Sequence, residues 1–167
     1  MNKLLKAIKV LIDTLMAIII IVGTIFLILF FIGIKPFVVQ TGSMEPEIQT
    51  GSISFINQNI KYEDIKLNDI IAFSMPSGER VTHRAISISE EGIETKGDAN
   101  VVADGMLVTK QNYFGKNVCS IPKVGYVISK IQTKRGKIIL GTMILMLFLS
   151  AILIGEPKKG KHSNEEK

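Results

Sequence analysis

The sequence predicts a mainly β domain of about 100 residues held between two apolar helices. Two long uncharged runs lie near the ends of the 167-residue chain, and short segments of alternating apolar and polar residues fill its middle. No segment of that middle shows a sustained helical period of apolar residues. Hydrophobic residues make up 47% of the chain, and the two end runs account for this high fraction.

The first apolar run, residues 15–34, has 20 residues without a charge. As a helix it would be about 30 Å long, the thickness of the hydrocarbon core of a bilayer. Residues 1–14 carry Lys3, Lys6 and Lys9, so the positive-inside tendency places them in the cytoplasm. A cleaved signal peptide is the alternative, but the run is longer than the usual apolar region and no small-x-small site follows it. We therefore expect an uncleaved membrane anchor.

The middle region, residues 35–137, is expected to form an extracytoplasmic β domain. Its strands are predicted from short alternating segments separated by Gly, Pro, Asn and Asp. The predicted strands are residues 52–56, 69–75, 80–89, 93–95 and 125–131. Residues 76–79, Pro-Ser-Gly-Glu, predict a turn that joins the second and third of these strands into a hairpin.

The second apolar run, residues 138–154, has 17 uncharged residues and would be about 26 Å long as a helix. This is the short end of the range for a membrane span, and a buried core helix is the alternative. The charged residues 155–167 then form a cytoplasmic tail. A basic cluster at Lys134, Arg135 and Lys137 opposes this orientation, but the first helix usually dominates.

The basic charge of the chain says little about nucleic acid, and we expect no nucleic-acid partner. Residues 36–137 hold 12 Lys and Arg against 11 Asp and Glu, so the net charge of +5 comes mostly from the membrane flanks. The only cysteine, Cys119, cannot form an internal disulfide and is predicted to be a small buried apolar residue. One histidine and one cysteine among scattered carboxylates do not match a metal site, and no Gly-rich loop fits a phosphate. We therefore expect neither a cofactor nor a metal.

Ser43 and His83 are the candidate nucleophile and base. A serine hydroxyl needs a neighbouring base at neutral pH, and a histidine can accept and return a proton there. Ser43 follows the first apolar run by nine residues, and His83 is the only histidine between the two runs. The other histidine, His162, lies in the tail on the far side of the predicted membrane. The alternatives are a turn residue at Ser43 and a structural strand residue at His83.

A histidine base also needs a partner that orients its ring, commonly a carboxylate. Asp98 lies in Lys-Gly-Asp-Ala-Asn at residues 96–100, and Asp104 lies in Ala-Asp-Gly at residues 103–105. Each aspartate alone is typical of a turn. Spacing along the chain leaves open which of the two contacts His83.

Three motifs together carry a family resemblance: Thr-Gly-Ser-Met-Glu-Pro at 41–46, Arg-Val-Thr-His-Arg at 80–84, and Lys-Gly-Asp-Ala-Asn at 96–100 with Asp-Gly at 104–105. The chain resembles type I signal peptidases of the endoplasmic-reticulum type, a Ser-His-Asp class also found in archaea and some Gram-positive bacteria. The resemblance covers residues 36–130 and the preceding anchor helix.

The resemblance implies that Ser43 is the nucleophile, His83 the general base and Asp104 the third catalytic residue, with Asp98 a second important aspartate. The common bacterial class has a lysine in place of His83. No lysine lies between Lys66 and Lys96, so a Ser–Lys dyad is disfavoured.

The resemblance further implies an all-β catalytic domain on the outer face of the cell membrane, in a multi-pass protein. Its expected partners are precursor proteins with signal peptides, cut after small residues, together with membrane lipid and the secretion translocon. Two alternatives remain. One is a membrane-anchored serine protease with a narrow set of propeptide substrates. The other is a non-catalytic β domain that binds a partner.

Overall fold

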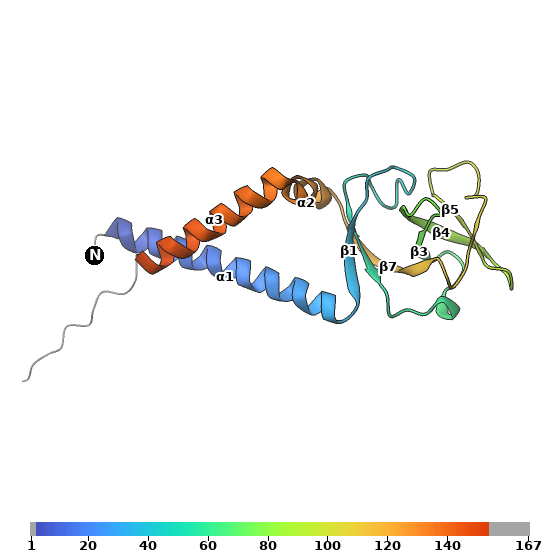
Figure 1. The fold of residues 1–167 in the computed structure, drawn as a ribbon, viewed down its shortest axis with the longest axis horizontal. Coiled ribbons are helices and arrows are strands. Elements are labelled where there is room, and N and C mark those ends of the chain that lie inside the picture. The colour runs from blue at the N-terminus through green and yellow to red at the C-terminus, as the bar shows by residue number, and fades with distance from the viewer. Residues whose placement is uncertain (1–2, 154–167) are drawn as a thin grey trace, which may run out of the picture.

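Residues 3–153 are described by the structure, a computed structural model, which is elongated with its β strands at one end and its helices at the other (Figure 1). The elements in chain order are α1 (Lys3–Phe31), β1 (Ile34–Val38), β2 (Ile53–Asn57), the 3-10 helix η1 (Tyr62–Asp64), β3 (Ile70–Ser74), β4 (Arg80–Ile88), β5 (Ile93–Lys96), β6 (Leu107–Val108), β7 (Tyr113–Ile121), α2 (Val124–Gln132) and α3 (Lys134–Leu153).

The seven strands form one antiparallel sheet in the order β1-β2-β7-β3-β4-β5-β6. Apolar side chains from β3, β4, β5 and β6, together with Ile65 just after η1, form its main core, which consists of Ile65, Ile71, Phe73, Ala85, Ile93 and Val108. Their alternation along each strand places them on one face, as the pleat of a strand requires. The mainly β architecture predicted from the sequence is therefore confirmed.

The predicted hairpin is also confirmed. β3 and β4 pair antiparallel from Ile70 opposite Arg84 to Ser74 opposite Arg80, and the Pro-Ser-Gly-Glu segment closes the turn between them. Gly78 has a φ of +83°, a left-handed conformation that favours glycine. This hairpin matters for the site because it fixes the position and the facing of His83.

The strand predicted at residues 125–131 is wrong, because this segment lies within helix α2. Its apolar residues Val124, Val127, Ile128 and Ile131 fall at the i, i+3, i+4 and i+7 positions of one helical face. The segment is short, and its adjacent apolar residues also fit a strand pattern.

Gly125 docks α2 on the sheet domain. It is buried, and a Cβ at this position would lie 2.6 Å from the carbonyl oxygen of Gly51 and 2.7 Å from that of Ser52. Tyr126 covers Gly51 from the same helix. The backbones can approach this closely only because position 125 has no side chain.

The two long helices extend beyond the predicted apolar runs. α1 begins at Lys3 and ends at Phe31, so it includes most of the segment predicted as a cytoplasmic N-terminus, and Ile34 already belongs to β1. α3 begins at Lys134, and the end of the predicted second run, Ile154, lies outside the described residues together with the predicted tail 155–167. Both helices are long and apolar enough to cross a membrane.

Figure 1 shows α1 and α3 crossing at the end far from the sheet and diverging toward it, with α2 between α3 and β1. An apolar groove lies between α1 and the sheet, and Phe26, Phe55 and Cys119 are among the residues that line it. Cys119 is exposed in this groove, so its prediction as a buried residue is wrong. Cys119 lies in the C-terminal half of β7, and this half of the strand faces α1 instead of the core.

Candidate active site

Ser43 lies in the loop between β1 and β2, and its neighbours anchor that loop. Met44 and Ile48 are almost fully buried and pack with Ile70 of β3. The main-chain N–H of Ile48 donates to the carbonyl oxygen of Met44, which forms a helical turn just after the serine. Burial of these two side chains holds the loop against the sheet, while the half-buried Ser43 side chain reaches the surface groove.

His83 extends from the middle of β4 and contacts two of the candidate residues. Its Nε2 lies 3.0 Å from Oγ of Ser43, and its Nδ1 lies 2.7 Å from Oδ2 of Asp104. The His83 residue is only 7% exposed, and its ring packs edge-on against Phe73. An imidazole protonated at Nδ1 donates to Asp104 and can accept the Ser43 proton at Nε2.

Asp104 is held by two hydrogen bonds to Thr95, a residue that the sequence analysis did not single out. The Thr95 hydroxyl donates to Oδ2 of Asp104 at 2.6 Å, and the Asp104 main-chain N–H donates to the Thr95 carbonyl at 2.9 Å. Thr95 lies fully buried on β5. Its only sequence signal was its strand alternation with Ile93, which placed a polar side chain on the inner face.

Asp98 does not contact His83. Both of its oxygens accept from Arg84, at 2.8 Å from Nε and 2.6 Å from Nη2, and Nη1 of Arg84 donates to the carbonyl of Asn68. This side-chain hydrogen bonding to Asp98 raises the pKa of Arg84 above its usual value. Because Arg84 follows His83 on β4, the ion pair ties that strand to the loop that carries Asp98.

The same loop also contacts the serine segment directly. The main-chain N–H of Ala99 donates to the carbonyl oxygen of Ser43 at 2.9 Å. Gly97 is buried beside it, and a Cβ there would lie 2.6 Å from that carbonyl oxygen. The loop after β5 therefore positions Ser43 through its backbone and His83 through Asp104.

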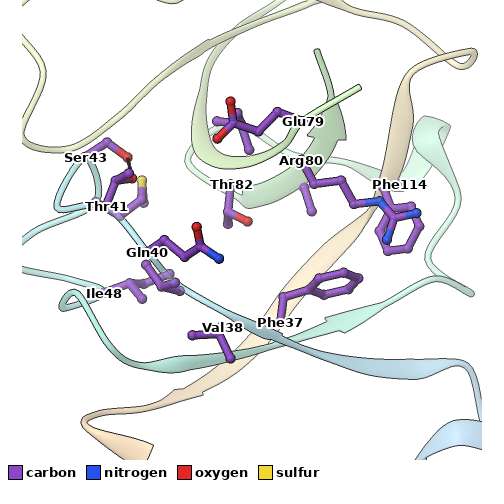
Figure 2. Close-up of a pocket in the computed structure, with 14 residues that line it drawn as sticks. Phe37, Val38, Gln40, Thr41, Ser43, Ile48, Glu79, Arg80, Thr82 and Phe114 are labelled. Atoms are coloured by element: carbon purple, nitrogen blue, oxygen red, sulfur yellow. Dashed lines mark hydrogen bonds between the residues drawn. The ribbon is translucent and has the colours of Figure 1, made fainter. Parts of the chain in front are cut away.

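A groove of about 280 Å³ runs from Ser43 along β1. Figure 2 shows Val38 and Gln40 on one side, with Thr82 and Arg80 of β4 on the other. The guanidinium of Arg80 lies 4.1 Å from the ring centroid of Phe114, and this pair closes the end of the groove away from the serine. β1 is the terminal strand of the sheet, so its outer edge is unpaired within the described residues.

Thr41 lines the groove next to the serine. Its Oγ1 lies 3.5 Å from Oγ of Ser43 (Figure 2). Glu45 ties the far side of the same loop, because its Oε1 accepts from the main-chain N–H and the hydroxyl of Thr50. The main-chain hydrogen bond from Thr50 is the largest cause of the lowered pKa of Glu45.

Within residues 3–153, no group of three or more His, Cys, Asp or Glu side chains could hold a metal ion.

Comparison with known protein families gives the family that the three motifs resemble, and the match includes the segments that carry Ser43, His83 and Asp104. The family described as "Signal peptidase, peptidase S26" matches residues 11–123. "Signal peptidase I W" of Bacillus subtilis (strain 168) is 36% identical over 78 residues, which are 44% of this chain and 41% of the relative.

Two further relatives share the name "Signal peptidase complex catalytic subunit SEC11". The protein of Scheffersomyces stipitis is 35% identical over 101 residues, 54% of this chain and 61% of the relative. The protein of Clavispora lusitaniae is 32% identical over 130 residues, 71% of this chain and 77% of the relative. The chain thus spans less than two thirds of the first two relatives and about three quarters of the third.

Proposed function

Because this chain belongs to the signal peptidase S26 family, we propose that it is a membrane-bound serine endopeptidase that removes N-terminal signal peptides from secreted precursor proteins. The main support for the proposal is that His83 is hydrogen bonded to Ser43 through Nε2 and to Asp104 through Nδ1. The family match extends over the loop, the hairpin and the aspartate segment that supply these three residues.

In the proposed reaction, Oγ of Ser43 attacks the scissile carbonyl while Nε2 of His83 takes the hydroxyl proton. Asp104 holds the ring through Nδ1 and stabilises the imidazolium that forms. His83 then returns the proton to the leaving amine, which is the new N-terminus of the mature protein. Water hydrolyses the acyl-enzyme on Ser43 by the same proton transfers in the reverse sense.

The tetrahedral intermediate needs donors for its oxyanion. The main-chain N–H of Ser43 and the hydroxyl of Thr41, which lies 3.5 Å from the nucleophile, are the donors that we assign to it. Loss of one such donor typically lowers kcat by about 10² to 10³.

The groove supports an extended peptide substrate with small side chains near the cut. Its volume of about 280 Å³ is at or below the small end of ligand pockets, and its walls are close to the serine. A peptide added along β1 would use main-chain hydrogen bonds for affinity and the groove for side-chain selection. This agrees with the small residues that the family resemblance implies before the cleavage site.

We place the catalytic domain on the outer face of the cell membrane, with α1 and α3 as its two spans. Both helices leave the same end of the β domain, and both pass the length and hydropathy requirements of a span. A signal peptide also has its apolar part in the bilayer. Anchoring enzyme and substrate in the same plane restricts the search and sets the height of the scissile bond. The secretion translocon would then be a neighbouring partner.

The full chain in detergent micelles, incubated with a secretory precursor, tests the proposal. Mass spectrometry should find a single cut after a small residue and a mature N-terminus, and the Ser43→Ala chain should leave the precursor intact. Equal cleavage by the wild type and the Ser43→Ala chain would refute the assignment. A cut confined to one propeptide, with several signal-peptide precursors untouched, would favour the narrower propeptide protease.

A further inference from the structure

The part of the described chain from the end of β7 through α3 has charge of only one sign. Residues 121–153 contain five basic side chains and no acidic one, and the five are Lys123, Lys130, Lys134, Arg135 and Lys137. By contrast, residues 36–120 contain seven basic and eleven acidic side chains. Within the described part of the chain, the ion pairs found involve none of these five. The proposed peptidase chemistry does not use this basic segment.

An apolar groove lies at the junction of α2 and α3, beside two of these cations. Val127 and Ile131 of α2 line one wall, and Ile139, Leu140 and Met143 of α3 line the other. Lys130 and Arg135 line the same groove. Val127 is 59% exposed and Met143 is 57% exposed, so neither wall is covered by the rest of the described chain.

The two helices are joined by a compact elbow. The Thr133 hydroxyl donates to the carbonyl of Lys130 at the end of α2 and accepts from the main-chain N–H of Gly136 at the start of α3. A Cβ at Gly136 would collide with the main chain of Lys130 and Ile131. The elbow therefore fixes Lys130 and Arg135 on adjacent turns of two helices, although both side chains are exposed.

We propose that this groove binds an anionic phospholipid of the outer leaflet. The phosphate lies with Lys130 and Arg135, and one acyl chain follows the apolar side chains toward Met143. Arginine offers a planar set of donors that fits phosphate oxygens, and lysine adds a mobile point charge. An amphipathic helix with basic side chains on its polar face is a form that lies in the membrane interface, and α2 has an apolar face and Lys130 in its last turn.

The charge pattern selects an anionic lipid over a zwitterionic one. Each Lys or Arg at an anionic membrane surface strengthens binding about fivefold, so losing both groove cations should weaken it about 30-fold. The same attraction accounts for a basic cluster on the outer side of the membrane, where the positive-inside tendency disfavours it. The inference rests on the proposed membrane anchoring and is independent of the peptidase reaction.

Native mass spectrometry of the full chain in detergent tests the inference. The protein is equilibrated with equal amounts of phosphatidylglycerol and phosphatidylcholine of the same acyl chains, and the lipid retained on the protein is counted. The test variant is Lys130→Gln with Arg135→Gln. The matched control is Lys61→Gln with Lys66→Gln, which removes the same charge from exposed positions on the β domain.

We expect the wild type and the control to retain phosphatidylglycerol preferentially, with the preference declining as salt rises, and the test variant to lose it. Equal retention of both lipids by the wild type, or an unchanged preference in the test variant, would overturn the inference. Competition by inorganic phosphate at the concentration of the lipid would also overturn it, since it would indicate a free-anion site. The Ser43→Ala chain should bind lipid as the wild type does, so failure of this inference is distinguishable from failure of the proposed activity.

Discussion

Asp98 and Asp104 lie in the same loop but have different partners, and this difference predicts different variant behaviour. Asp104 accepts from His83, whereas Asp98 accepts from Arg84. Asp104→Asn should lower kcat on the order of 10⁴-fold with little change in thermal stability, because an amide disturbs the histidine tautomer. Asp98→Asn should instead lower stability by about 1–2 kcal/mol, because Arg84 loses a charged partner. Precursor-cleavage kinetics and thermal unfolding separate the two, and the reverse ranking in kcat would contradict the assignment.

Thr95 is expected to be a positioning residue for Asp104. Thr95→Val keeps the shape of the side chain but removes the hydroxyl that donates to Oδ2 of Asp104. We expect kcat to fall about 10-fold or more with KM nearly unchanged, because a hydrogen bond to a charged group is lost near the reacting base. Thr95→Ser retains the hydroxyl and should act as the wild type. If the Ser and Val variants lose kcat equally, the hydroxyl has no positioning role.

Tyr113 gives the folded protein a predicted sensitivity to high pH. Burial raises the pKa of Tyr113 to about 12, and its hydroxyl donates to the carbonyl of Ile60. An unfolded tyrosine titrates near pH 10, so the neutral phenol stabilises the fold below about pH 10 and this contribution is lost as pH rises toward 12. Phenolate absorbance should show a late phase that Tyr113→Phe removes. A titration curve unchanged by that substitution would exclude a shifted pKa for Tyr113.

At the residue scale, the motifs and their spacing could nominate side chains but could not assign their partners, and only the family resemblance favoured Asp104 over Asp98. Ser43 and His83 were candidates because nucleophile and base chemistry left few choices in the middle region. Their contact depends on the β3–β4 hairpin, which local turn signals predicted. The partners of Asp98 and Asp104 depend on the path of an irregular loop, and no periodicity describes such a path. Thr95 was missed because its role requires that same loop to return to β5.

Among the elements, the strands β2 to β5 were predicted from alternation and flanking turn residues, whereas the strands β1, β6 and β7 and the helix α2 were not. α2 spans only nine residues, and a segment of this length with neighbouring apolar residues fits both periods. The helix packs against the sheet domain at Gly125, which lies against the main chain of Gly51 and Ser52, and local periodicity does not record this contact. The exposure of Cys119 was missed for a related reason. The C-terminal half of β7 faces α1 across a groove, and no local sequence pattern indicates such a groove.

The loop after β5 is the element whose position decides the alignment of the site. Gly97→Ala would introduce a Cβ 2.6 Å from the Ser43 carbonyl oxygen, so the loop and the serine must separate. A displacement of about 1 Å at a reacting group can cost on the order of 10²-fold in rate, and we expect a loss of that size in kcat. Gly78→Ala, at an exposed turn with open space around it, is the control and should lose some stability with no loss of kcat. Full activity of Gly97→Ala would show that the close packing is not required.

The charged residues are unevenly distributed along the chain. In residues 36–120 the acidic side chains outnumber the basic ones by eleven to seven, whereas the charged residues of 121–153, a range that includes α2 and α3, are all basic. If α1 and α3 span the membrane as we propose, the basic residues of 121–137 lie beside the lipid and the acidic residues lie farther out. This charge distribution favours one orientation of the protein on an anionic surface. In that orientation the groove at Ser43 would lie on the β domain outside the lipid, with α1 and α3 as the proposed spans within it.

The orientation of the whole chain can be read with single cysteines, because the protein has only Cys119. In a Cys119→Ser background, Ser77→Cys places a thiol on the exposed β3–β4 turn, and Ser163→Cys places one in the predicted cytoplasmic tail. A membrane-impermeant maleimide should label Ser77→Cys on intact cells and Ser163→Cys only after permeabilisation, as two spans with both termini inside require. Labelling of Ser163→Cys alone on intact cells would show that the protein has the opposite orientation in the membrane. Labelling of both would show that α3 lies along the outer surface, so that the basic elbow and not a second crossing holds the C-terminal part at the membrane.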